Sequence, residues 1–215
     1  MISKLNKIIF NNKLIPQYLC NKLKVENIHS TANKSHAMAT NIVWMDLEMT
    51  GLDVMTDNIL EVSCLITDKD LNVVAEGPCF AINQPKEVLD NMNEWCIKHH
   101  NESGLVEKCL KSQITTEKGE LLILDFLKSH IPKGKCPLAG NSVYMDRLFL
   151  RKEMPKVDDY MHYRIIDVST VKELARRWHP QILENAPAKK IAHRSLDDIK
   201  DSIEELKYYR QVFFK

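Results

Sequence analysis

The order of extended and helical segments constrains the fold more than any other feature of this sequence. Residues 42–48, 59–67 and 71–82 are rich in β-branched and aromatic side chains, which predicts three consecutive strands. The third strand is interrupted by Gly77-Pro78, and a tight turn is expected at residues 68–70.

Helices and strands alternate after the third strand. The apolar spacing predicts helices at 94–111, 116–130, 144–152, 170–178 and 195–213, and short strands at 136–140 and 163–168. Ser169 is expected to cap the helix that follows it. The whole order predicts an α/β fold, a mixed sheet with helices on both faces, and excludes a helical bundle and a β-sandwich.

The first forty residues differ in charge from the rest of the chain. They hold six lysines and one acid, Glu26, a net charge of +5, and apolar residues recur at helical spacing between Ile2 and Ile9. This pattern predicts a mitochondrial targeting segment at 1–40, expected to be disordered, although it contains no arginine. The alternative is a disordered basic arm. A second start at Met38 would give a cytosolic form without the segment.

The remaining residues, 41–215, carry 24 basic and 28 acidic side chains, a net charge of −4. Proteins that track long nucleic acids usually present a basic stripe and have a high isoelectric point. A phosphate-bearing substrate of this chain should therefore be short, or should meet its positive charge in bound metal ions. No stretch is apolar for the eighteen or so residues that a membrane span needs, so no membrane partner is expected.

Asp46 and Glu48 stand two residues apart on the first predicted strand. Side chains at i and i+2 of a strand point to the same face, so both carboxylates project together. Two carboxylates this close repel unless a cation lies between them, and a hard divalent ion such as Mg²⁺ is the natural partner. A D-x-E triplet alone is more often solvated surface, but the apolar flanks and Thr50-Gly51 favour a site at a strand end.

Two further polar groups lie at predicted helix starts. Asp146 would open its helix, where the alternative to a functional role is an acid that complements the helix dipole. His193 and Asp198 are five residues apart and share no face of one regular helix. They can converge if His193 lies in the preceding loop and the helix starts near Ser195, although a single histidine is more often structural or exposed. Asp197 is the better candidate for a cap or a surface acid.

The order D-x-E, then D, then H-x-x-x-x-D resembles the DEDDh family of 3′→5′ exonucleases, which have an RNase H-like fold. The sequence is closer still to the oligoribonuclease branch of that family, which includes mitochondrial members. The likeness is collinear from about Asn41 to the C-terminus. It rests on residues 44–52, 140–142 with 146–147, 162–164 with 167–170, 172–178 and 193–198. It implies an RNase H-like mixed five-stranded sheet flanked by helices.

The resemblance implies that Asp46, Glu48, Asp146 and Asp198 hold two Mg²⁺ (or Mn²⁺) ions and that His193 is the general base. Two such ions can activate a water and stabilise both the entering and the leaving oxygen of a phosphodiester. A histidine pKa near neutrality suits the transfer of the water's proton.

The resemblance also implies how the substrate is bound. Leu52 and Trp95 match an apolar wedge for the terminal bases, and Tyr163 matches an active-site tyrosine that arrives from the second subunit of a homodimer with shared active sites. A tryptophan such as Trp95 would by itself more often be a core residue. The alternative for Arg164 is a surface ion pair. The positions that match contacts to the far phosphate of the substrate are His100, Ser142, Arg164, Ser169 and Thr170.

The sequence thus predicts a metal-dependent 3′→5′ exoribonuclease, with its exonuclease domain at 41–215, that degrades dinucleotides and slightly longer RNA to 5′-mononucleotides in mitochondria (matrix or intermembrane space). One alternative is a DEDDh exonuclease that trims longer RNA or DNA 3′ ends, which the acidic balance of 41–215 disfavours. The other is a non-catalytic RNA-end binder, which the five intact chemical positions disfavour.

Overall fold

The computed structural model of the chain describes residues 38–187 and 195–214. The chain divides into two units, Met1–His36 and Ala37–Lys215, and all of the described residues belong to the second. The predicted targeting segment lies almost wholly outside the described residues, and so does the predicted general base His193. Within the described part, no helix has the length and apolar character needed to cross a bilayer.

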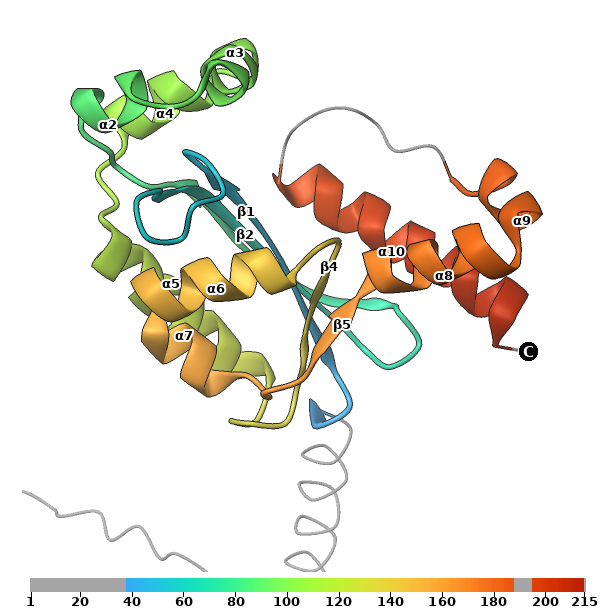
Figure 1. Ribbon diagram of the computed structural model, residues 1–215. Coiled ribbons are helices and arrows are strands. Elements are labelled where there is room, and N and C mark those ends of the chain that lie inside the picture. The colour runs from blue at the N-terminus through green and yellow to red at the C-terminus, as the bar shows by residue number, and fades with distance from the viewer. Residues whose placement is uncertain (1–37, 188–194, 215) are drawn as a thin grey trace, which may run out of the picture. The chain divides into compact units, whose positions relative to one another are not determined.

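A five-stranded mixed sheet forms the centre of the described unit (Figure 1). Its strands are β1 (Ile42–Met49), β2 (Ile59–Thr67), β3 (Val73–Ala81), β4 (Leu138–Gly140) and β5 (Ile165–Asp167), in the spatial order β3-β2-β1-β4-β5. The β1–β2 and β2–β3 pairs are antiparallel, whereas the β1–β4 and β4–β5 pairs are parallel. The predicted mixed sheet is confirmed, and β1 is its middle strand.

The two faces of β1 explain how this strand serves both the core and the site. Val43, Met45 and Leu47 are buried in the core on one face, and Trp44 is buried in the core on the other. The indole Nε1 of Trp44 donates to the Thr67 hydroxyl at 3.0 Å, so its buried polar atom is satisfied. Because side chains alternate along a strand, the carboxylates that follow Trp44 at i+2 and i+4 share its face.

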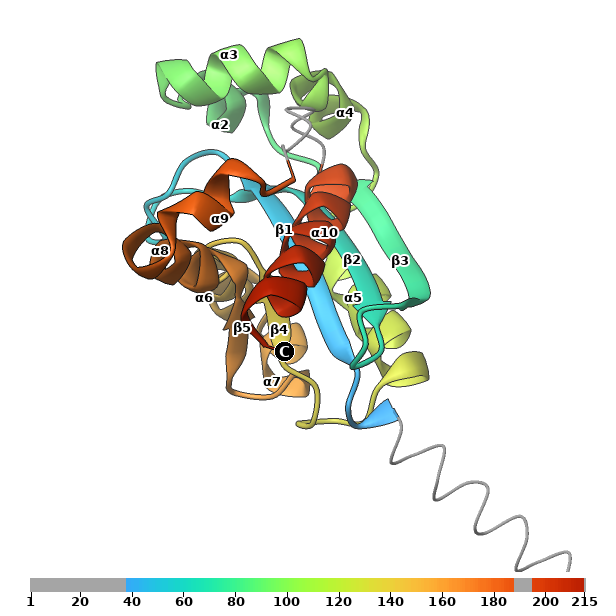
Figure 2. The same cartoon turned by 90° about the vertical axis from the view of Figure 1, so that its right-hand side faces the viewer.

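Helices cover both faces of the sheet. The helices α5 (Thr116–His130), α6 (Tyr144–Glu153) and α7 (Pro155–Tyr160) pack on the face of Val43. The helices α8 (Val168–Trp178), α9 (Pro180–Glu184) and α10 (Ser195–Phe213) belong to the core of the opposite face. Figure 2 shows α10 lying across β1 and β2, so its first turn is brought to the carboxyl end of β1.

A third group of helices stands at that same end of the sheet. The helices α2 (Lys86–Asp90), α3 (Glu94–Glu102) and α4 (Leu105–Lys111) form a small core with Leu60 of β2. The ring Nε2 of His100 on α3 lies 2.9 Å from the Met49 carbonyl oxygen at the end of β1. This contact ties α3 to the strand that carries Asp46 and Glu48.

Several local boundaries differ from the sequence prediction. The helix expected over 94–111 is two helices, because Gly104 between them adopts a left-handed conformation with φ 71°. The third strand starts at Val73, since Leu71 takes a positive φ of 67° in the turn. Asp167, and not Ser169, caps α8, because the Asp167 carboxylate accepts from the Ser169 N–H at 3.0 Å.

Other differences come from short elements. The helices α2, α7 and α9 were not expected, although Pro155 and Pro180 at the starts of α7 and α9 are residues favoured at a first helical position. Both parallel strands, β4 and β5, are shorter than predicted. The strand β3 continues through Gly77-Pro78, where a bulge lies opposite the buried Cys64.

Candidate active site

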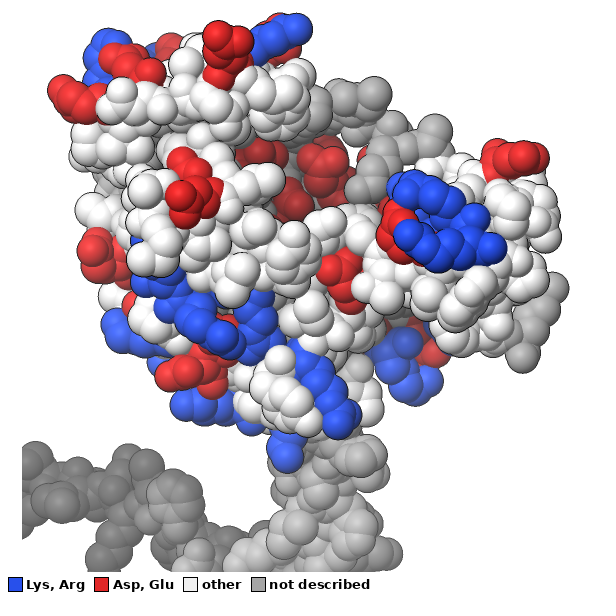
Figure 3. All heavy atoms as spheres, viewed as in Figure 1, with Lys and Arg blue, Asp and Glu red and all other residues white. Residues whose placement is uncertain are grey.

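Three carboxylates meet where β1 ends and α10 begins. Asp46 and Glu48 on β1 and Asp198 in the first turn of α10 each offer an oxygen, and these oxygens lie within 4.8 Å of one another. All three residues are half-buried. Figure 3 shows acidic side chains at the bottom of a hollow between the α2–α4 helices and the rest of the face. The structure therefore brings together three of the four residues that the sequence suggested as metal ligands.

The fourth, Asp146, lies beside this group and is bound to β1. It stands in the first turn of α6, is 6% exposed, and its Oδ1 accepts from the Leu47 backbone N–H at 2.9 Å. Leu47 lies between Asp46 and Glu48, so the hydrogen bond fixes Asp146 to the strand that carries them. Burial raises the pKa of Asp146 to about 7.

The charge of this site favours a cation. Burial first, and then the neighbouring carboxylates of Glu61, Asp198 and Asp146, raise the pKa of Glu48 to about 8. A bound divalent cation would reverse these effects, because it stabilises the ionised form of each carboxylate. The donors are all carboxylate oxygens, the set that hard ions such as Mg²⁺ and Mn²⁺ prefer. The residues present therefore fit a divalent metal site.

Glu61 on β2 is a member of the site that the sequence analysis missed. It is the cross-strand neighbour of Glu48, is 4% exposed, and accepts from the Ser195 hydroxyl at 2.6 Å. The Ser195 hydroxyl also lies 2.6 Å from the hydroxyl of Ser63. Ser195 is the first residue of α10, so Glu61 anchors the helix turn that carries Asp198. A glutamate among the mostly apolar residues of β2 was the available signal.

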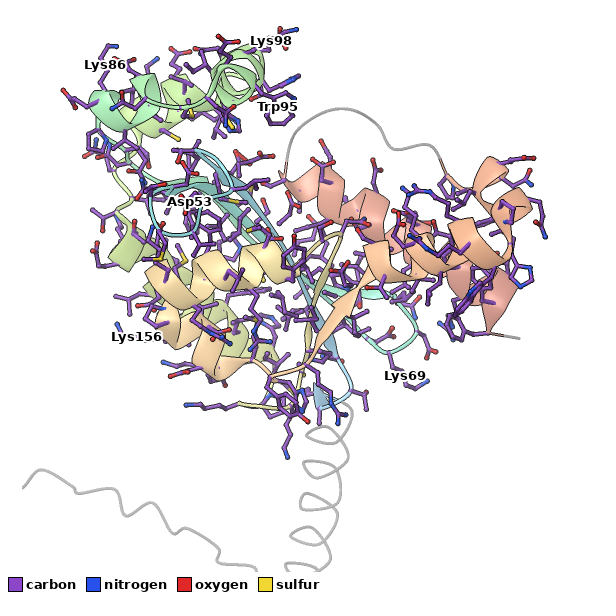
Figure 4. All side chains as sticks on the ribbon, viewed as in Figure 1. Asp53, Lys69, Lys86, Trp95, Lys98 and Lys156 are labelled. Atoms are coloured by element: carbon purple, nitrogen blue, oxygen red, sulfur yellow. The ribbon has the colours of Figure 1, made fainter. Side chains whose placement is uncertain are left out.

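A pocket of about 420 Å³ adjoins the carboxylates. Glu48, Leu52, Trp95 and His100 all line it. Leu52 and Trp95 are 67% and 58% exposed, so the core alternative for Trp95 is wrong. Figure 4 shows Trp95 projecting from α3. His100 is buried, and its contact with Met49 gives it a role in holding α3 in place.

The loop that carries Leu52 is held by Asp57. The Asp57 carboxylate accepts from the Thr50 hydroxyl at 2.7 Å and from the Asp53 N–H at 2.9 Å. A Cβ at Gly51 would collide with the same carboxylate, so a larger residue there would displace Asp57. The loop therefore presents Leu52 from a fixed base.

A second pocket, of about 370 Å³, gathers three of the remaining predicted residues. Ser142, Ser169 and Thr170 line it, together with Asp167 and Arg177. The Ser142 N–H donates to Asp167 Oδ1 and to the Ser169 hydroxyl, both at 3.0 Å. Ser142 has a positive φ of 54°, so its backbone is held in a turn that these bonds stabilise. His100, which was grouped with these residues by sequence, lines the other pocket.

Tyr163 and Arg164 line neither pocket in this chain. Tyr163 is 73% exposed, Arg164 is also exposed, and the Arg164 guanidinium lies 5.3 Å from the centre of the Tyr163 ring. His193, the expected base, lies outside the described residues. Asp197 is exposed, in agreement with its assignment as a surface acid.

Carboxylates gathered at the end of the central strand of such a sheet define a class, the metal-dependent nucleases with an RNase H-like fold. A family model described as "Exonuclease" matches residues 43–206, and this family implies metal dependence. Among similar proteins, a "Probable oligoribonuclease" of Drosophila melanogaster is 60% identical over 189 residues, which cover 88% of this chain and 90% of that protein. The "Oligoribonuclease, mitochondrial" of Homo sapiens is 55% identical over 179 residues, which cover 83% of this chain and 76% of that protein. The chain therefore belongs to the exonuclease family and, within it, to the oligoribonucleases.

Solved structures agree on the fold. Exonuclease I of Methylocaldum szegediense has a TM-score of 0.61 at 14% identity, over 81% of this chain and 41% of that one. A complex of Escherichia coli Exonuclease I with a dA16 oligonucleotide has a TM-score of 0.61 at 15% identity, over 80% of this chain and 41% of that one. The chain thus spans well under half of these proteins, and the likeness shows the fold alone.

Proposed function

We propose a two-ion hydrolytic mechanism for this chain, which is a 3′→5′ exonuclease that degrades short oligoribonucleotides. The observation that carries the mechanism is the meeting of Asp46, Glu48 and Asp198 within 4.8 Å at the end of β1. These residues, with Asp146 beside them, would hold Mg²⁺ or Mn²⁺. Two such ions, when bound, supply Lewis-acid stabilisation of the entering and leaving oxygens of a phosphodiester.

His193 would take the proton of the attacking water. It precedes Ser195, the first residue of α10, by two positions, and Asp198 by five. The neutral imidazole has a pKa suited to this transfer at physiological pH. The hydrogen bond between Ser195 and Glu61 supports the assignment, because it fixes the helix start two positions after the proposed base.

The pocket beside Glu48 would receive the terminal bases. Leu52 and Trp95 are exposed apolar side chains on its wall, and a base can stack on an aromatic ring with little sequence preference. We assign the far phosphate of a short substrate to His100, Ser142, Arg164, Ser169 and Thr170. Contacts that grip a terminal 5′-phosphate select short substrates by geometry, since a longer chain leaves them unsatisfied or clashes with them.

We further propose that Tyr163 and Arg164 act on the site of a partner subunit. Their exposure, and their absence from both pockets of their own chain, support this assignment. In a two-fold homodimer each subunit lends the same patch to the other. Asp46→Ala would destroy its own metal site but lend a normal Arg164, whereas Arg164→Ala would do the reverse.

Mixing these two variants tests the shared site. Random reassembly of equal amounts gives half heterodimers with one whole site each, so about a quarter of all sites should recover. If Arg164 served its own chain, no mixture could rebuild a whole site. Activity that stays flat after verified subunit exchange therefore contradicts the shared site.

Residues 1–40 would direct the chain to mitochondria, to the matrix or the intermembrane space, and a start at Met38 would leave it in the cytosol. The +5 charge of this segment and the mitochondrial relatives in Homo sapiens and Mus musculus support the proposal. A reporter fused to residues 1–40 should enter mitochondria. If the reporter stays diffuse in the cell, residues 1–40 are only a basic arm and do not target the chain to mitochondria.

The assay that tests the function as a whole uses residues 38–215 and end-labelled RNAs of two to twenty nucleotides. Dinucleotides should be hydrolysed fastest, to 5′-mononucleotides, and EDTA should stop the reaction. Rates that rise with length and fall steeply with salt would favour an exonuclease for longer ends. Binding without hydrolysis would favour the RNA-end binder.

A further inference from the structure

Arg147 on α6 is a buried cation that the proposed mechanism does not use. It is 8% exposed, and its Nε donates to Asp158 Oδ1 at 2.8 Å. Its Nη1 donates to two successive carbonyl oxygens, those of His162 at 2.7 Å and Tyr163 at 3.1 Å, and lies 3.5 Å from that of Arg164. One guanidinium thus holds the backbone of three consecutive residues.

We infer that Arg147 is a positioning residue that presents Tyr163 and Arg164 to the partner's active site. The inference rests on the proposed shared site. With the carbonyls turned inward to the guanidinium, the side chains of Tyr163 and Arg164 are exposed. The backbone of this loop is therefore fixed from behind, while its side chains stay free to reach another molecule.

The outer side of the loop is also ordered within one chain. The rings of His162 and Tyr163 stack with centroids 4.4 Å apart, and the Arg164 N–H donates to His162 Nδ1 at 3.0 Å. The His162 N–H donates in turn to the Cys136 carbonyl at 2.9 Å. A loop that is already in its binding conformation loses less conformational entropy when the partner's substrate arrives.

An arginine is needed here because of the geometry of its donors. The planar guanidinium presents several N–H groups in a fixed fork, so one side chain can bind the Asp158 carboxylate and the loop carbonyls at the same time. A lysine ammonium keeps the charge but is a point donor on a flexible stem. Asp158 is itself 7% exposed, and its other oxygen accepts from Arg151 at 3.2 Å.

Arg151 provides a matched control. It shares Asp158 with Arg147, but its side chain is 66% exposed, and its Nε donates to Asp158 rather than to the loop. Arg151→Met therefore perturbs the same carboxylate without removing a donor to the carbonyls of residues 162–164.

The readout is the ratio of kcat/KM for a 5′-phosphorylated dinucleotide to that for the same dinucleotide with a 5′-hydroxyl. This ratio does not depend on the fraction of folded enzyme, so a variant that is merely less stable leaves it unchanged. Arg147→Lys and Arg147→Met should each lower the ratio about tenfold or more, the effect of losing a charge-assisted hydrogen bond to the phosphate. The loss should lie in KM, and Arg151→Met should keep the wild-type ratio.

Arg164→Ala, assayed in parallel, distinguishes the proposed contact of Arg164 with the 5′-phosphate from the positioning role of Arg147. If Arg164→Ala leaves the ratio unchanged, the proposed grip on the 5′-phosphate is wrong and the role of Arg147 falls with it. If Arg164→Ala abolishes the preference but Arg147→Lys keeps it, the grip stands and the positioning role is wrong. Should Arg147→Met fail to fold, Arg147→Lys and Asp158→Asn decide the same question.

Mixing Arg147→Met with Asp46→Ala provides a second readout. Arg147→Met keeps its own carboxylates but lends a displaced loop, so heterodimers should regain activity on 5′-phosphorylated dinucleotides as the Arg164→Ala mixture does. Recovery with Arg164→Ala but none with Arg147→Met would overturn the inference.

Discussion

Two groups of charged residues contain neighbouring residues of α6, Asp146 in one and Arg147 in the other, and the two groups compensate charge in opposite ways. The acidic group, Asp46, Glu48, Asp146 and Asp198, is held in a setting where burial raises the pKa of Glu48 to about 8 and that of Asp146 to about 7. The arginine group consists of Arg147, Asp158 and the carbonyls of residues 162–164, and opposite charge and aligned acceptors surround the cation.

This difference in charge compensation distinguishes the acidic group, which suits a binding site, from the arginine group, which supports the loop at residues 162–164. Burying a charge costs free energy unless the charge is compensated. In the arginine group, the Asp158 carboxylate and the loop carbonyls compensate the charge of Arg147, so the backbone of the loop is held in a fixed geometry. In the acidic group, burial and the neighbouring carboxylates raise the pKa of Glu48, which suits a site that an added cation completes. The acidic group should therefore respond strongly to metal, and the arginine group should not.

The largest expected effect is the loss of a carboxylate from the acidic group. Asp198→Ala should abolish turnover and weaken Mg²⁺ binding, because it removes one of the three carboxylates that meet at the end of β1 and that we propose as metal ligands. Asp197→Ala changes the exposed neighbour in the same helix turn and should keep wild-type activity. Calorimetric titration with Mg²⁺ and dinucleotide hydrolysis measure the two effects. An Asp198→Ala enzyme within about tenfold of the wild-type rate would contradict the assignment.

His193→Ala should have the next largest effect. The rate should fall by about 10²–10⁴-fold, the range for a lost general base, while substrate and metal binding persist. This combination distinguishes a base from a ligand, since loss of a ligand reduces metal binding as well. Single-turnover rates and Mg²⁺ titration on the same preparation check it. Near-normal turnover at pH 7 would show that another group takes the proton.

Much of the acidic group could be predicted because it depends on local geometry. The i, i+2 rule places Asp46 and Glu48 on one face of β1, and a helix start at Ser195 allows Asp198 to reach them. Asp146 required the resemblance, since nothing local shows that its carboxylate on α6 accepts from the Leu47 N–H on β1.

The supporting contacts could not be predicted, because they join residues that are distant in sequence. Ser195 meets Glu61 across 134 positions, and Arg147 meets the carbonyls of residues that only the packing of α6 and α7 brings near. Glu61 in a mostly apolar strand and Arg147 beside Asp146 were visible in the sequence. Neither position, however, indicates which residue it contacts. Trp95 illustrates the same limit, since exposure on α3 depends on how that helix docks over the sheet.

A smaller effect is expected where the acidic group has a support of its own. Ser195→Ala removes the hydroxyl that joins the start of α10 to Glu61, so Asp198 should be held less firmly. Metal affinity should fall by about 10–100-fold, the usual result of losing an outer contact of a metal site. Ser129→Ala, which removes an exposed serine hydroxyl on α5, should change nothing. Unchanged affinity in Ser195→Ala would limit Glu61 to a packing role.

The smallest effect concerns the stability of the metal-free enzyme. The pKa of Glu48 in the fold, about 8, lies above its ordinary value of 4.5, so the protonated form stabilises the fold. This contribution is complete below about pH 4.5 and is lost as the pH rises through about 8. The Tm without metal should therefore be lower at pH 8.5 than at pH 6.5, and saturating Mg²⁺ should restore it. Glu48→Gln stays neutral at both values and should reduce the slope, with Asp146, whose pKa is about 7, responsible for the remainder.

At pH 8.5 without metal, Glu48→Gln should raise Tm by at least about 2–4 °C, the shift that about 1 kcal/mol produces in a domain of this size. Glu87→Gln on the surface of α2 should leave the slope as it is. Arg147→Lys should lower Tm equally at both pH values, because the arginine group is compensated by ion pairing and carbonyls rather than by a proton. If Tm of Glu48→Gln fell between pH 6.5 and 8.5 as much as that of the wild type, the pH dependence would arise outside the acidic group. A pH-dependent loss of Tm in Arg147→Lys would mean the same. The contrast between a site completed by metal and a support completed by the chain would then fail.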